Sequence, residues 1–230
     1  MPILGATGAL GYGLSLRLAL ASVPTVIGSR SARRAAATAR RVEETARRRV
    51  DGQAPGLRVD AALNVDATAL GRIVIVCVPF EAQADVLSSI AGRLEPGQVL
   101  VDTTVALAPA VAGRDARLAE APQGSSAERA QRIVPAGVSV VAALQTVSAA
   151  SLGDLEHDLD EDVLLTGDDT PAKRAVAQLL SRVPGLRPVD CGRLGSAGAV
   201  EALAPLLMTA NRHYRSRAGI RLTGLREPLW

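Results

Sequence analysis

Three glycines near the start of the chain, Gly5, Gly8 and Gly11, constrain the fold more than any other feature of the sequence. They stand between a short apolar run and a segment with helical spacing. Glycine at these positions lets backbone N–H groups approach a pyrophosphate closely and aims a helix N-terminus at its negative charge. The pattern predicts a strand–turn–helix unit that binds a dinucleotide. The spacing is weak evidence by itself, because the chain holds 21 glycines.

The rest of the chain alternates short β-branched runs with longer helical segments, which predicts a parallel sheet covered on both faces. We expect strands at residues 2–4, 25–27, 73–78, 98–101, 139–142, 162–165 and 186–189. We expect helices at residues 10–21, 32–49, 82–94, 126–133 and 171–183. A last apolar helical segment, 199–215, is expected to complete the substrate side or a subunit interface. The fold class is therefore α/β, a Rossmann-like doubly wound parallel sheet with a small C-terminal helical part.

Composition excludes several classes of protein. With 230 residues, 48% hydrophobic and 21% charged, the chain has an ordinary globular balance. No apolar stretch is long enough to span a membrane and no leader precedes a cleavage site, so we expect a cytoplasmic protein with no membrane partner. Only four aromatic residues are present, and no basic stripe is interleaved with them, which disfavours nucleic acid.

Neither the cysteines nor the acidic residues predict a metal site. Cys77 and Cys191 are far apart in the sequence, and Cys77 lies in an apolar run typical of a buried strand. The acidic run at 154–162 is more typical of a solvated loop, because neighbouring residues do not converge on one point. His213 stands among arginines and is expected on an exposed helix face. We therefore expect no metal.

The segment after the second expected strand indicates which dinucleotide binds. This position contacts the adenosine ribose in dinucleotide-binding folds: an acid there prefers NAD, and an arginine accommodates the 2′-phosphate of NADP. Here Ser29 and Arg30 are followed by Arg33 and Arg34, with no acid. Ser31 also suits the N-cap of the following helix, and both interpretations can hold together. The sequence favours NADP.

Phe80 follows Pro79 directly after the most apolar expected strand. Ligands bind at the carboxyl edge of open α/β sheets, so this lone phenylalanine is placed where it can pack on a nicotinamide. Filling the core is nearly as plausible for it. No Ser-His-Asp or Cys-His arrangement is visible, which suits hydride transfer, because the nicotinamide supplies that chemistry.

At this point the chain resembles a known family, the NADPH-dependent reductases of the deazaflavin coenzyme F420, over nearly its whole length. The resemblance rests on the glycine turn, on Ser29-Arg30 and on Val78-Pro79-Phe80. It continues through later segments that are more specific, at residues 140–147, 162–169, 185–192 and 201–207.

The resemblance implies an NADP-binding Rossmann-like domain at 1–150, a substrate-side and dimer part at 151–230, and a homodimer. It implies that a hydride passes between the nicotinamide and the deazaflavin, with no catalytic side chain and with Gln145 as a substrate contact. The pyrophosphate would be held by Thr7, Gly8, Ala9 and Leu10, the 2′-phosphate by Ser29, Arg30 and Arg34, and the nicotinamide half would lie along Phe80, Ala84, Leu107 and Ala149.

This sequence departs from the family's pattern on the deazaflavin side. Gln145 replaces a histidine, and Ala202 and Ala204 replace hydroxyl residues. Gln145 can still donate a hydrogen bond, whereas the alanines cannot. Two alternatives therefore stay open: an NADPH-dependent reductase of another acceptor (flavin, ferric chelate or imine), and a non-catalytic NADP-binding sensor. A cleft lined by arginines would favour F420 as the acceptor. A narrow apolar cleft would favour a small acceptor, and a closed cleft would favour the sensor.

Overall fold

Eight strands form the centre of the molecule in the computed structural model, which describes residues 1–50, 56–108, 115–119, 124–227 and 229–230. The strands are β1 (Pro2–Leu4), β2 (Thr25–Ser29), β3 (Val59–Leu63), β4 (Ile73–Val76), β5 (Val99–Asp102), β6 (Ser139–Ala142), β7 (Glu161–Gly167) and β8 (Leu186–Asp190). All seven expected strands are present, with ends that shift by no more than two residues. The first strand is as short as the sequence indicates, with three residues.

The α-helices are α1 (Ala9–Leu20), α2 (Ala32–Arg49), α3 (Asn64–Thr68), α4 (Phe80–Ile90), α5 (Ser126–Ile133), α6 (Ala149–Gly153), α7 (Thr170–Leu180), α8 (Ala197–Glu201) and α9 (Leu203–Tyr214). Two 3₁₀ turns, η1 (Ala91–Arg93) and η2 (Leu194–Ser196), connect them. The helices expected at 32–49 and 126–133 have these bounds in the structure. Ser31 caps α2 by accepting a hydrogen bond from the N–H of Arg34, as its sequence position indicates.

The sheet has the strand order β3-β2-β1-β4-β5-β6-β7-β8. Every neighbouring pair is parallel except β6 and β7, which are antiparallel, so the expectation of an all-parallel sheet is wrong at this one junction. Between these strands the only helix is α6, with five residues, and it packs against α1. A parallel connection would need a helix that crosses back over the sheet, and here none does.

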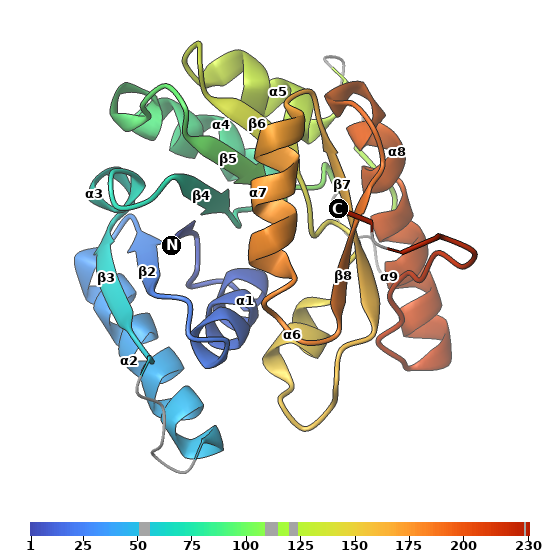
Figure 1. The fold of residues 1–230 in the computed structure, drawn as a ribbon, viewed down its shortest axis with the longest axis horizontal. Helices are drawn as coiled ribbons and strands as arrows, with labels where there is room; N and C mark the ends of the chain where they lie inside the picture. The colour runs from blue at the N-terminus through green and yellow to red at the C-terminus, as the bar shows by residue number, and fades with distance from the viewer. Residues whose placement is uncertain (51–55, 109–114, 120–123, 228) are drawn as a thin grey trace.

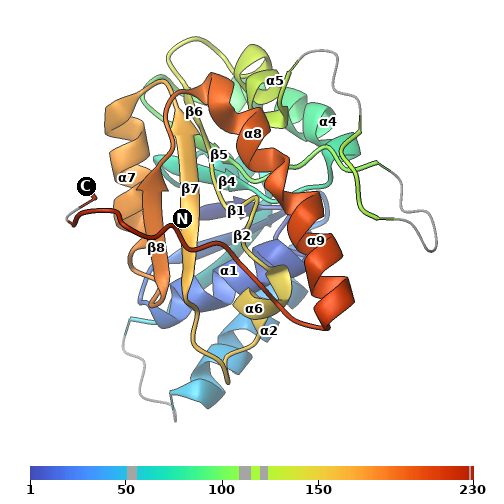
Figure 2. The same cartoon turned by 90° about the vertical axis from the view of Figure 1, so that its right-hand side faces the viewer.

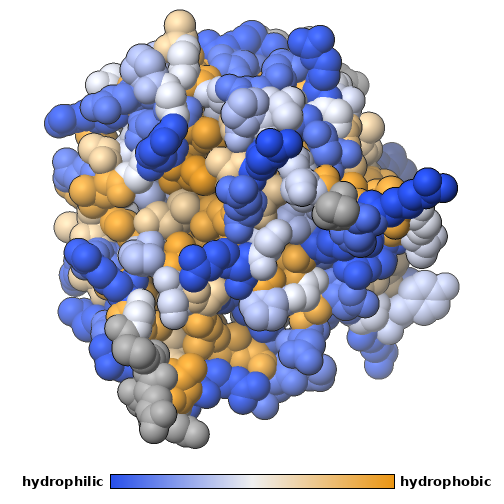
Figure 3. All heavy atoms as spheres, viewed as in Figure 1, coloured by the Kyte–Doolittle hydropathy of each residue, from blue (hydrophilic) through white to orange (hydrophobic). Residues whose placement is uncertain are grey.

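Helices cover both faces of the sheet (Figure 1). In the turned view, α1, α2 and α7 lie on one side and α4 and α5 on the other (Figure 2). Successive side chains of a strand point to opposite faces of the sheet: Ile3 packs in the core with α1 and α2, and Leu4 packs in the core with α3 and α4. On the surface, hydrophilic side chains surround the rim of the face shown in Figure 3, with hydrophobic ones nearer its middle.

The C-terminal part contains two features that the sequence did not indicate: a break in the expected helix, and an extended segment after α9, residues 216–227 and 229–230, which we call the C-terminal strap. The helical segment expected at 199–215 divides into α8 and α9 next to Ala202. Pro205 explains the break, because its ring clashes with the carbonyl four residues earlier and it has no N–H to donate. After α9 the chain runs back across β7 and β8 (Figure 2). Trp230 ends this strap within its own chain, donating its indole N–H to the carbonyl oxygen of Pro188 (2.8 Å).

None of the described helices combines the length and the apolar composition that crossing a bilayer requires.

Candidate functional site

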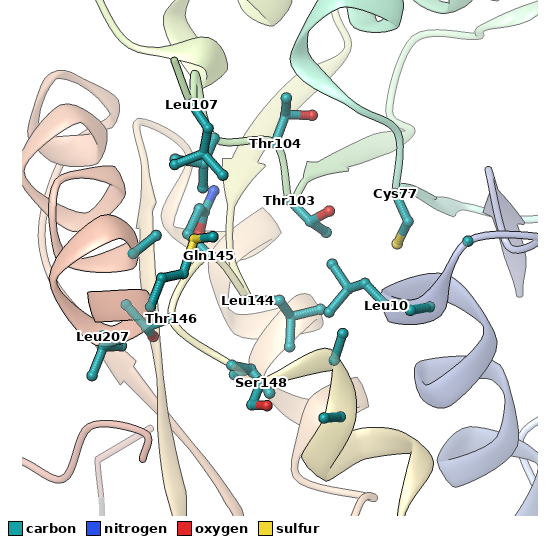
Figure 4. A pocket seen from close by; sticks show the side chains of 18 of the residues that line it. Leu10, Cys77, Thr103, Thr104, Leu107, Leu144, Gln145, Thr146, Ser148 and Leu207 are labelled. Carbon is teal, nitrogen blue, oxygen red and sulfur yellow. The ribbon is translucent and has the colours of Figure 1, made fainter. Parts of the chain in front are cut away.

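The carboxyl ends of the parallel strands border a cavity of about 550 Å³. Its walls come from the glycine turn, the segments after β4 and β5, the turn after β6, and α9 (Figure 4). The C-terminal strap adds Ala218 to its edge. This volume lies within the range of small-molecule sites, which is roughly 300–1,000 Å³. One cavity therefore joins the predicted phosphate turn to the C-terminal helix.

Two glycines of the turn are required by the fold itself. Gly5 has φ +77°, and a Cβ there would lie 2.4 Å from the carbonyl oxygen of Cys77. A Cβ on Gly11 would lie 2.7 Å from the Cα of Ala6. Both positions therefore exclude any side chain, because these contacts are with backbone atoms that cannot move aside.

Gly8 is different, because the protein leaves space beside it. A Cβ there would meet nothing closer than the carbonyl oxygen of Gly5 at 3.5 Å, and the residue is exposed at the edge of the cavity. Gly8 is the N-cap of α1, and no side chain in the described part of the chain caps this helix. The first N–H groups of α1 thus have no intrahelical partner and face the space that Gly8 leaves open. This is the cradle that a phosphate group requires.

Two of the other predicted pyrophosphate residues, Ala9 and Leu10, line the cavity with Gly8. Thr7 is exposed beside the turn and is not among the lining residues. Leu10 and Leu144 face one another across the cavity (Figure 4).

Two of the three predicted 2′-phosphate residues, Ser29 and Arg30, line a second, smaller cavity of about 290 Å³ at the end of β2. Its other walls come from the start of α3 and from residues 82–89 of α4. Asp85 of α4 also contributes to the wall. Arg34, the third residue of α2, does not line this cavity. Within the described residues, the exposed guanidinium groups of Arg30 and Arg34 have no hydrogen-bond or ion-pair partner, which leaves them available to an anion.

The residues predicted along the nicotinamide half are only partly brought together. Phe80, Leu107 and Ala149 line the larger cavity, and Ala84 does not. Phe80 begins α4, and the guanidinium carbon of Arg129 lies 3.7 Å from the centroid of its ring. Phe80 thus belongs to a wall of the cavity, although the sequence left core filling nearly as plausible.

Gln145 lines the cavity. Its Nε2 donates one N–H to the carbonyl oxygen of Asp102 (2.9 Å), which leaves the second N–H of the amide for a ligand, and the role of Gln145 as a substrate contact stays a prediction. Of the two alanines that depart from the family's pattern, Ala204 lines the cavity, and Ala202 is exposed outside it.

Leu144 holds a strained backbone in the wall of the cavity. It is buried, 1% exposed, and has φ +73°, a conformation that L side chains rarely adopt. Such a residue costs about 1–3 kcal/mol and persists where the surrounding structure enforces it. The strained position turns the chain after β6, so that the segment from Gln145 to Ala150 forms one side of the cavity.

Sequence reasoning missed Asp102, which lies at the end of β5 behind this site. Its carboxyl group is fully buried, and Oδ1 accepts hydrogen bonds from Gln83 Nε2 (2.7 Å) and Thr104 Oγ1 (2.9 Å). Burial raises the pKa of Asp102 to about 7, against the effect of these hydrogen bonds. The signal in the sequence was the polar run Asp102-Thr103-Thr104 directly after an apolar strand.

The acidic run does not form a cluster of possible metal ligands. Asp154 binds the guanidinium group of Arg217 and the Nδ1 of His157 (2.9 Å). In the ranges that the structure describes, no group of three or more His, Cys, Asp and Glu side chains is arranged to hold a metal ion. His213 is exposed on α9, as expected.

Comparison with known proteins agrees with this geometry. Residues 2–106 match the model of a family described as NADP oxidoreductase, coenzyme F420-dependent. The F420-dependent NADP reductase of Methanothermobacter marburgensis is 38% identical over 227 residues, which cover 98% of this chain and 98% of that protein. The F420-dependent NADP reductase of Methanocaldococcus jannaschii is 36% identical, with 97% of both chains covered.

A solved structure extends the similarity to three dimensions. A crystal structure from Arthrobacter sp. FB24, provisionally described as an F420-dependent NADP-reductase, matches with a TM-score of 0.74 at 25% identity. The match covers 94% of this chain and 95% of that one.

Proposed function

This chain belongs to the family of coenzyme F420-dependent NADP oxidoreductases, and on that premise we propose that it transfers a hydride between NADP(H) and the deazaflavin coenzyme F420. The observation that carries the proposal is the continuity of the larger cavity. It extends from the open phosphate turn at Gly8 to Leu207 and Met208 of α9. The nicotinamide and its acceptor must lie side by side in one site for hydride transfer. This cavity has lining residues for both of them.

The cofactor would be held by backbone and side-chain groups from two strand ends. The space beside Gly8 and the free N–H groups of α1 suit the pyrophosphate. Ser29, Arg30 and Arg34 suit the 2′-phosphate, with Thr7, Ala9 and Leu10 completing the turn. When bound, NADPH supplies the hydride itself, so the protein needs no nucleophile or general base.

The residues of the larger cavity orient the reacting rings and exclude water. Phe80, Leu107 and Ala149 form the nicotinamide side of the wall, and Gln145, Ala204 and Leu207 form the side nearer α9. We assign no role to Ala84 beyond its place on α4. Thr103 and Thr104 also line the cavity, and their hydroxyl groups donate to the carbonyl oxygen of Val76 (3.0 Å) and to Asp102 Oδ1 (2.9 Å).

One observation favours a second candidate, a reductase of a smaller and less charged acceptor. No arginine is among the described residues that line the larger cavity, and its lining is mostly apolar. The tail of F420 carries a phosphate and glutamates, for which arginines would be suited. The larger cavity continues beyond the residues predicted along the nicotinamide to Leu207 and Met208 of α9, which argues against the third alternative, a sensor with a closed cleft.

Three expectations remain predictions: that residues 1–150 bind NADP while residues 151–230 form the substrate side and the dimer contact, that the protein is a homodimer, and that it is cytoplasmic. A second copy of the chain has a suitable surface in α9, where Leu206 is 65% and Tyr214 74% exposed. Light scattering on purified protein measures this directly: a dimer's mass supports the prediction, and a monomer's mass refutes it.

The decisive assay mixes the protein with NADPH and F420 and follows the visible absorbance of the deazaflavin. Loss of that absorbance supports the proposed function. The deazaflavin riboside without its phosphate and glutamate tail serves as the second substrate in a parallel series. If only the riboside or a flavin is reduced, the second candidate is correct.

A further inference from the structure

The lone phenylalanine of the chain, Phe80, is held from outside the cavity by Arg129. The guanidinium group stacks on the ring, 3.7 Å from its centroid, and its Nη2 donates to the carbonyl oxygen of Phe80 (2.6 Å). A cation is attracted to the electron-rich face of an aromatic ring. Arg129 therefore fixes both the ring and the main chain of one residue.

Gln83 in turn fixes Arg129. Its Oε1 accepts a hydrogen bond from Arg129 Nε (2.7 Å), and its Nε2 donates to Asp102 Oδ1 (2.7 Å) and to the carbonyl oxygen of Ser126 (3.1 Å). The side chain is fully buried. Because the carbonyl oxygen only accepts and the guanidinium only donates, the amide has one permitted orientation. Gln83 is a rigid link between the buried carboxyl group of Asp102 and the guanidinium group of Arg129.

The three residues act on the cavity from behind its wall. Asp102 comes from β5, Gln83 from α4 and Arg129 from α5, and none of them is among the lining residues. Of the three, Arg129 contacts Phe80, which does line the cavity, and Asp102 and Gln83 act on the ring through Arg129. The position of the Phe80 ring is therefore linked to the buried end of β5.

We propose that Gln83 and Arg129, anchored by Asp102, are positioning residues that hold the Phe80 ring as the wall against which the nicotinamide half of the cofactor is placed. This inference rests on the proposed function, because it assigns the larger cavity to NADP(H). It goes beyond that function by naming the residues that set the geometry of hydride transfer without touching either reactant.

The test uses the fact that Phe80 is the only phenylalanine. Protein produced with 4-fluorophenylalanine gives a single ¹⁹F resonance that reports on this ring. The resonance is recorded for the wild type, Arg129→Gln, Arg129→Lys and Asp102→Asn, each alone, with NADPH, and with 2′,5′-ADP. The ligand 2′,5′-ADP contains the adenosine half of the cofactor and has no nicotinamide. Arg93→Gln is the control, since Arg93 is exposed in η1 beyond the end of α4.

NADPH is expected to shift the wild-type resonance, and 2′,5′-ADP to leave it nearly unchanged. Arg129→Gln should broaden the resonance of the free protein and reduce the shift with NADPH. It should also lower kcat/KM for NADPH about three- to tenfold, the size expected for loss of one partly desolvated cation–π contact. The line width, the NADPH-induced shift and kcat/KM of Arg129→Lys should lie between those of the wild type and Arg129→Gln. Asp102→Asn should change the same three quantities in the same direction as Arg129→Gln, but by less. Affinity for 2′,5′-ADP should not change in any variant.

Two results would overturn the inference: a wild-type resonance that NADPH leaves in place although calorimetry shows binding, or an Arg129→Gln protein with wild-type spectra and kinetics. A second arm repeats Arg129→Gln in a Phe80→Leu background. Its effect on kcat/KM should disappear there, and persistence would mean that Arg129 does not act through Phe80. Failure of the proposed function looks different: either calorimetry shows no NADPH binding, or NADPH binds and F420 is not reduced. In both cases the resonance of the free protein still reports whether Arg129 restrains the ring.

Discussion

Gly5 donates its backbone N–H to the carbonyl oxygen of Gly28 (3.2 Å), which ties the turn after β1 to the last residues of β2. The space beside Gly8 and the hydroxyl and guanidinium groups of Ser29 and Arg30 are therefore fixed relative to one another. A ligand with a pyrophosphate and a ribose phosphate needs two anion sites at a set separation. The hydrogen bond between Gly5 and Gly28 helps to fix that separation.

Filling the space beside Gly8 should remove cofactor binding without unfolding the protein. Gly8→Val places a branched side chain where the phosphate would lie, and the extended backbone of Gly8 (φ −83°, ψ 167°) accepts valine. We expect the Kd for NADPH, measured by calorimetry, to rise at least about tenfold, while Tm falls by only a few degrees.

The matched control is Gly11→Ala, where the new Cβ would lie 2.7 Å from the Cα of Ala6. This change overpacks the core and should destabilise the protein by about 1–3 kcal/mol. If Gly8→Val proved as destabilising as Gly11→Ala, the space beside Gly8 would not be open. If Gly8→Val bound NADPH normally, the phosphate would not lie there.

Removal of Arg30 and Arg34 should weaken NADPH binding far more than NADH binding. Hydrogen bonds to charged groups contribute about 1.5–3 kcal/mol each, so the double alanine variant, which loses two such arginines, should lose roughly a hundredfold or more in affinity for NADPH. Arg40→Ala is the control, because Arg40 is exposed further along the same helix. Equal losses for NADPH and NADH would refute the 2′-phosphate assignment.

The first unit of the fold could be predicted from local sequence because its signals are local. The glycine turn, the cap at Ser31 and the apolar runs each act over a few residues, and the structure places β1, α1, β2 and α2 where they indicate. β3 was missed because it pairs only with β2, at one edge of the sheet. Most of its residues are partly or fully exposed, so it has no apolar run.

Longer-range features could not be predicted in this way. The direction of β7 depends on how the chain after β6 packs α6 against α1, which no strand pattern encodes. The link from Asp102 through Gln83 to Arg129 joins residues of three elements, and neither end of it has a motif. The hydrogen bond from Gln145 Nε2 to the carbonyl oxygen of Asp102 likewise depends on the fold, because it joins two segments that are 43 residues apart in the sequence.

Stability should fall as pH rises, in part because of Asp102. Burial raises its pKa to about 7 from an ordinary value of 3.8, so between these values the folded state binds more protons than the unfolded state. Stability is then lost as pH rises from about 4 to about 7 and stays lower above this range. Burial also raises the pKa of Glu201, with an effect of the same sign.

Asp102→Asn isolates the contribution of this carboxyl group. Urea unfolding of the variant and the wild type at pH 5, 6, 7 and 8 should show the variant gaining relative stability as pH rises, because asparagine never carries the buried charge. A constant difference across these pH values would contradict the assignment.

The most direct test of the account is a single turnover with NADPH that carries deuterium at the transferred position. The protein is in excess, F420 is the acceptor, and the reduced deazaflavin is examined by mass spectrometry. We expect the deazaflavin absorbance to disappear and the deuterium to be recovered on the reduced deazaflavin, since the cavity brings both rings together away from water. Persistence of the absorbance while calorimetry shows NADPH bound, or a product without deuterium, would contradict it.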